Sequence, residues 1–66
     1  MKDFYIKMVD GERYLFRGEK LQDVINAIGN ALLYNRGFLE VRDALTYKYI
    51  TININQIVSI EEDDEL

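Results

Sequence analysis

One segment of the chain, residues 19–37, repeats its apolar residues at helical spacing, and this pattern constrains the fold more than any other feature. The repeated residues fall every three or four positions, which places them on one side of a 3.6-residue helix. They are Leu21, Val24, Ile25, Ile28 and Leu32. The segments before and after residues 19–37 alternate apolar and polar residues, as half-buried strands do. The sequence therefore predicts one helix packed across one face of a small sheet.

Residues 3–17 are predicted to form a β-hairpin, because Asp10-Gly11 is a turn signal between two strand-like runs. A two-residue turn would mix charged residues into both faces. A three-residue loop that ends with Gly11 in the left-handed conformation, followed by a bulge, avoids this and is preferred. It places Phe4, Ile6, Met8, Tyr14 and Phe16 on one face, and Tyr5, Lys7, Arg13, Leu15 and Arg17 on the other.

Residues 38–42 and 47–53 are predicted to form a second hairpin with a four-residue loop at 43–46. Its core face carries Leu39, Val41, Ile50 and Ile52, and its other face carries Phe38, Glu40, Arg42, Tyr47, Tyr49 and Thr51. In this register Arg42 lies opposite Tyr47, and Glu40 lies opposite Tyr49. A short last strand follows at 57–60. The expected fold is α+β with the order ββαβββ, an antiparallel sheet of four to five strands with one helix across one face.

The helix is expected to begin after Gly18 as N-cap and to end at Gly37, which would adopt a positive φ. The core prediction follows from the apolar stripe. Ile25 and Ile28 should be buried against the sheet, in contact with Ile6, Leu39 and Ile50.

The net charge of −4 is concentrated at the C-terminus. All eight basic residues, but only seven of the twelve acidic ones, precede residue 61. The remaining acids are Glu61, Glu62, Asp63, Asp64 and Glu65. We expect residues 1–60 to form a single domain and residues 61–66 to form a disordered acidic tail, which either aids solubility or contacts a basic partner.

A chain of 66 residues is short for a stable core, since such a domain buries only about 60% of its unfolded surface. It contains neither cysteine nor histidine, so disulfides and zinc sites cannot stabilise it. Good packing of the helix on the sheet, self-association, or both remain as routes to stability, and we expect a homo-oligomer. The absence of a signal peptide or membrane-spanning stretch indicates a cytoplasmic protein without a membrane partner. The Ile-, Asn- and Lys-rich usage is typical of an AT-rich bacterial or phage genome.

Catalysis is not expected. Histidine and cysteine are missing, and the hydroxyls of Thr46, Thr51 and Ser59 have no base at a recognisable spacing. The glycines do not form a phosphate-binding loop, and the acidic tail is not preorganised for a metal ion. The sequence therefore predicts neither a catalytic site, nor a cofactor, nor a metal centre.

The face that combines the polar sides of both hairpins is the candidate site. It is rich in tyrosine and arginine, which are enriched where proteins meet partners and also suit stacking on bases. Its members are Tyr5, Arg13, Leu15, Arg17, Phe38, Arg42, Tyr47 and Tyr49. Tyrosine is also simply a good strand residue. We expect a small non-enzymatic protein-interaction module, an oligomeric accessory or inhibitor protein. The alternative is a binder of nucleic acid or of a small nucleotide, and a small hydrolase ranks below both.

Overall fold

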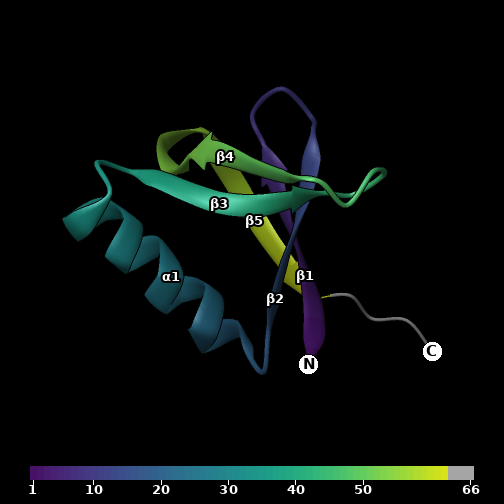
Figure 1. Cartoon of the computed structure of the whole chain (residues 1–66), viewed down its shortest axis with the longest axis horizontal. Coiled ribbons are helices and arrows are strands. Elements are labelled where there is room, and N and C mark those ends of the chain that lie inside the picture. Colours follow the sequence, from purple (N-terminus) through teal and green to yellow (C-terminus); the bar gives the residue numbers. More distant parts are fainter. Residues whose placement is uncertain (63–66) are drawn as a thin grey trace.

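The computed structural model describes residues 1–62 and confirms the predicted α+β fold, with one helix packed on a five-stranded antiparallel sheet (Figure 1). The order of elements is ββαβββ, with a 3₁₀ turn before the last strand. Their bounds are β1 Lys2–Met8, β2 Arg13–Gly18, α1 Leu21–Tyr34, β3 Phe38–Asp43, β4 Tyr49–Asn53, η1 Ile54–Gln56 and β5 Ile57–Glu62.

The strand order is β4-β3-β2-β1-β5, so β4 and β5 form the two edges. The sheet bends sharply between β2 and β3, which are paired at only two positions, Tyr14 with Asp43 and Leu15 with Arg42. Figure 1 shows the result: the hairpin of β3 and β4 runs across the direction of β1, β2 and β5. The bend closes the sheet around its own core.

The first hairpin has the predicted register. Gly11 has a φ of 89°, and the Met8 amide donates a hydrogen bond to the Glu12 carbonyl, which closes the loop of residues 9–11. Phe4 pairs with Phe16, and Ile6 pairs with Tyr14. Both pairs face the core, as expected from the alternation.

The second hairpin differs from its predicted register by two residues. Arg42 pairs with Tyr49, not Tyr47, and Glu40 pairs with Thr51, not Tyr49. The loop begins one residue later than predicted, because the Asp43 amide donates to the Lys48 carbonyl and closes residues 44–47, in which Tyr47 has a left-handed φ of 61°. A shift of two residues preserves the faces, so Leu39, Val41 and Ile52 still point into the core.

The helix buries a different strip from the predicted one. Val24 and Ala31 are buried, and Ala27 and Ile28 are partly buried against the core, whereas Ile25 is 47% exposed and Leu32 is 63% exposed. The helix packs mainly on β2, β3 and η1, and its two alanines allow close approach to them. Such a narrow contact cannot cover a wide apolar stripe. The predicted burial of Ile25 is therefore wrong.

Ile50 was also predicted to be buried, and it is 38% exposed. It lies on β4, which is an edge strand and has a neighbour on one side only. The centre of the core is instead Phe4, Ile6 and Val24, which are fully buried.

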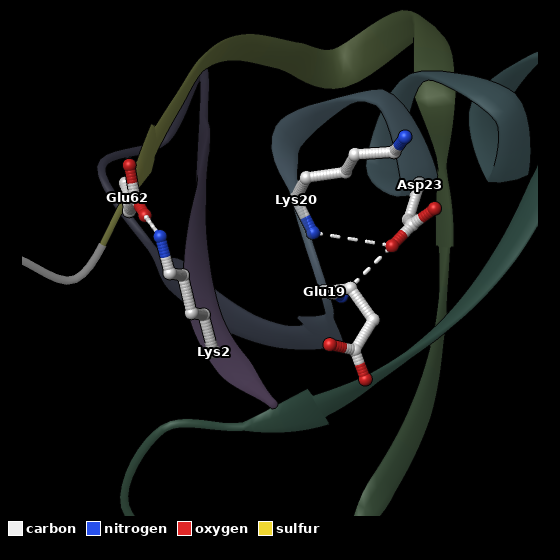
Figure 2. A network of polar contacts seen from close by, with 5 residues as sticks. All are labelled: Lys2, Glu19, Lys20, Asp23 and Glu62. Atoms are coloured by element: carbon white, nitrogen blue, oxygen red, sulfur yellow. Dashed lines mark hydrogen bonds and ion pairs between the residues drawn. The ribbon is translucent and has the colours of Figure 1, made fainter.

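The helix begins two residues later than predicted, because Lys20, not Gly18, is the N-cap. Asp23 Oδ2 accepts hydrogen bonds from the amides of Glu19 and Lys20, at 2.8 and 3.1 Å (Figure 2). Gly18 packs against this carboxylate, since a Cβ on residue 18 would lie 3.1 Å from the Asp23 Cβ. At the other end Gly37 has the expected positive φ, 84°.

Strand β5 extends through Glu62, so two acids assigned to the tail belong to the sheet. Glu61 pairs with Tyr5, and Glu62 pairs with Phe4 and forms an ion pair of 2.7 Å with Lys2 (Figure 2). The predicted tail therefore does not begin at Glu61, because Glu61 and Glu62 pair with β1. Asp63, Asp64 and Glu65 lie outside the described residues.

The same substitution at a buried and at a half-exposed isoleucine tests this core. We expect Ile6→Ala to reduce the free energy of unfolding by roughly 2 to 5 kcal/mol, because it leaves a cavity between the sheet and the helix. Ile25→Ala should cost less than about 1 kcal/mol, because water already reaches that side chain. Urea denaturation measures both. Equal losses would mean that the helix is rotated relative to the arrangement described.

Candidate functional site

A row of side chains crosses four neighbouring strands on the side of the sheet that faces away from the helix. Tyr5 on β1 pairs with Leu15 on β2, Leu15 pairs with Arg42 on β3, and Arg42 pairs with Tyr49 on β4. The core residues Phe4 and Ile6 point to the opposite side, toward α1. The two predicted hairpin faces are therefore joined into one surface, which we call the outer face.

Two arginines are held against tyrosine rings on the outer face. The Arg13 guanidinium carbon lies 4.3 Å from the centre of the Tyr5 ring, and that of Arg42 lies 4.6 Å from the centre of the Tyr49 ring. Arg42 Nη2 also donates a 2.6 Å hydrogen bond to the Tyr49 hydroxyl. These contacts fix the orientation of long side chains that otherwise rotate freely at a surface.

Leu15 lies beneath this layer. It is only 7% exposed, so it is not the exposed contact residue that was predicted. Its register between Tyr5 and Arg42 explains the burial, because the larger side chains on either side extend over it. Leu15 therefore supports the outer face and contributes little of its own surface.

A shallow cleft of about 260 Å³ opens on the outer face where β2 and β3 separate. Arg17 at its wall forms a 3.1 Å ion pair with Asp3, and Glu40 on β3 forms no ion pair within residues 1–62. The cleft thus contains both signs of charge beside tyrosine rings. Its lining comprises Met1, Asp3, Leu15, Phe16, Arg17, Glu40, Val41, Arg42, Tyr47 and Tyr49.

Phe38 does not join the cleft. It lies at the start of β3 and borders a separate, open depression with Tyr34, Asn35, Arg36, Glu40 and Thr51. The predicted site residues therefore divide. Leu15, Arg17, Arg42, Tyr47 and Tyr49 line the cleft, Tyr5 and Arg13 stack at its β1 side, and Phe38 is apart.

The loop between β3 and β4 positions the tyrosines of the cleft. Asp43 Oδ1 accepts hydrogen bonds from the Leu45 and Thr46 amides, at 2.8 and 3.0 Å. The bonds from the Thr46 and Leu45 amides stabilise the charged carboxylate and lower the pKa of Asp43 below its ordinary value of 3.8. The turn that Asp43 organises sets the register that brings Tyr49, not Tyr47, opposite Arg42.

The outer face combines tyrosine rings, guanidinium groups and carboxylates. Within the part of the chain that the structure describes, no three acidic side chains gather as they would around a metal ion. No helix in residues 1–62 is long and apolar enough to cross a membrane. The groups that the face presents are tyrosine rings, the guanidinium groups stacked on them, and the carboxylates of Asp3 and Glu40.

Two charged residues of the cleft, Asp3 and Glu40, were not among the predicted site residues. Asp3 could have been found, since the hairpin register that places Phe4 opposite Phe16 also places Asp3 opposite Arg17. Glu40 was placed on this face by the alternation of the strand but was not chosen as a site residue, and its position in the cleft depends on where the two hairpins join.

Comparison of the chain with protein-family models, with curated proteins and with solved structures found no match.

The role of Asp43 predicts a dependence of stability on pH. Its pKa is lower in the folded than in the unfolded protein, so its contribution is present above the unfolded value of about 4 and is lost as the pH falls through the folded pKa. Asp43→Asn keeps an acceptor oxygen but removes the charge. We expect the variant to be less stable than the wild type at pH 7, and the difference to disappear as the pH falls below about 4. Urea midpoints measured across this range would contradict the assignment if the two curves stayed parallel.

Proposed function

We propose that this protein is a non-enzymatic interaction module, a small oligomeric accessory or inhibitor protein of bacterial or mobile-element origin that acts in the cytoplasm. It binds another protein through its outer face. The observation that carries the proposal is the row from Tyr5 through Arg42 to Tyr49, in which both arginines are already stacked on tyrosine rings.

Preorganisation supports recognition of a protein. Association costs about 0.5 to 1.5 kcal/mol for each flexible side chain that becomes fixed, and Arg13 and Arg42 are oriented before any partner arrives. Tyrosine and arginine over a floor formed by Leu15 match the residues that contribute most of the energy at interfaces. The mixed charges of Arg17, Asp3 and Glu40 supply a polar rim.

The backbone of Tyr47 supports a role for its side chain. A left-handed φ of 61° costs a bulky residue about 1 kcal/mol, whereas glycine adopts it freely. The strained residue sits over the cleft. Residues with strained backbone conformations are frequent at functional sites, where the surrounding structure holds them in place.

Nucleic acid is the second candidate, since a base stacks well on tyrosine beside arginine. Two observations favour a protein instead. The guanidinium groups of Arg13 and Arg42 already cover ring faces that a base would need. Asp3 and Glu40 also bring negative charge into the cleft, where a phosphate backbone would be repelled.

Substitution of Tyr47 tests the proposal. Tyr47→Gly removes the side chain and the strain together, so we expect unfolding free energy to stay the same or rise by up to about 1 kcal/mol while capture of the partner is lost. Immobilised protein would be incubated with bacterial lysate, with and without nuclease, and bound proteins identified by mass spectrometry.

Arg36→Gly is the matched control, because Arg36 also has a left-handed φ, 55°, but does not line the cleft. It should retain capture. Capture of the same protein by Tyr47→Gly at wild-type levels would refute the assignment of this face, and capture that disappears on nuclease treatment would favour the nucleic-acid alternative.

A further inference from the structure

We propose that two copies of this chain associate by antiparallel pairing of their β4 strands across a two-fold axis at Thr51. The inference specifies the surface for the self-association included in the proposed function. It is independent of which external partner the outer face binds.

The free edge of β4 carries unpaired backbone groups. Within residues 1–62, β4 is an edge strand of the sheet and pairs only with β3. The Asp43 amide donates to the Lys48 carbonyl, and the Ile54 amide donates to the Gly37 carbonyl, so the even-numbered residues direct their backbone groups toward β3. By alternation, the amide and carbonyl groups of Tyr49, Thr51 and Asn53 point away from the sheet.

This edge lacks the usual protection against pairing. Residues 49–53 contain no charge, no proline and no bulge. The opposite edge is protected, because β5 has a register irregularity against β1 near Met8 and carries Glu61 and Glu62. Charged residues and an irregular register on an edge strand both discourage pairing with another chain, and β4 has neither.

One register of the two β4 strands pairs the largest number of their free backbone amide and carbonyl groups. With Thr51 opposite Thr51 of the second copy, Tyr49 lies opposite Asn53 of the second copy, and about six backbone hydrogen bonds form. A register centred elsewhere pairs fewer of the outward residues. On the inner side the same register places the half-exposed Ile50 beside Ile52 of the second copy and covers apolar surface.

The pairing would extend the sheet through both copies and bring their outer faces together. Tyr49 and the Arg42 stacked on it would lie next to the two-fold axis. Two recognition surfaces would then face the same way, so that a partner with repeated sites would bind both.

Thr51→Lys tests the inference, with Val58→Lys as the matched control on the other edge. Both positions are exposed strand residues, so both variants should retain the wild-type circular dichroism spectrum. At about 100 µM, a concentration suited to a small interface, sedimentation should show a dimer for the wild type and for Val58→Lys. Thr51→Lys should be monomeric, because two lysines would meet at the axis.

Amide hydrogen exchange gives a second readout. The amides of Tyr49, Thr51 and Asn53 should exchange more slowly as the wild-type concentration rises, and those of Thr51→Lys should not respond. A monomeric wild type at 100 µM, a dimeric Thr51→Lys, or a dimer disrupted by Val58→Lys would each overturn the inference. None of these results would alter the dependence of partner capture on Tyr47, so failure of this inference and failure of the proposed function are distinguishable.

Discussion

The short join between β2 and β3 is the constraint on which the rest of the structure depends. Only Tyr14 with Asp43 and Leu15 with Arg42 are paired there. This pairing fixes the register between the two hairpins and so aligns Tyr5, Leu15, Arg42 and Tyr49 in one row. Continued pairing would have placed Arg17 opposite Glu40. Because the strands separate instead, a cleft forms between those two charges.

The two sides of the sheet are stabilised by different means. On the inner side, the bent sheet packs its apolar residues against each other and against the narrow strip of α1 that contains Val24 and Ala31. This arrangement completes a core with a single helix, and it leaves Leu32 on the solvent side of that helix. On the outer side, burial is limited to Leu15, and guanidinium groups stacked on tyrosine rings provide the order.

Hydrogen bonds from backbone amides to two carboxylates fix the conformation of segments that lie outside the small core. Asp23 binds the amides before the helix, and Asp43 binds the amides of the turn before β4. Each carboxylate satisfies backbone donors that would otherwise lack partners and thereby fixes the direction of the next element. Tyr47, four residues after Asp43, has a left-handed φ of 61°, and its side chain lines the cleft.

The sequence by itself determined what depends on local periodicity: the order ββαβββ, the hairpin turn at Gly11, and which residues of each strand share a face. The assignment of residues to faces is correct although the register of the second hairpin was wrong, because a shift of two residues leaves every side chain on the same face of the strand. Tertiary structure decided the partner of Arg42, the exposure of Ile25, the burial of Leu15 and the pairing of Glu62. Each of these depends on where the two hairpins join and on how closely the helix approaches them, and those distances arise from contacts between segments that no local pattern encodes.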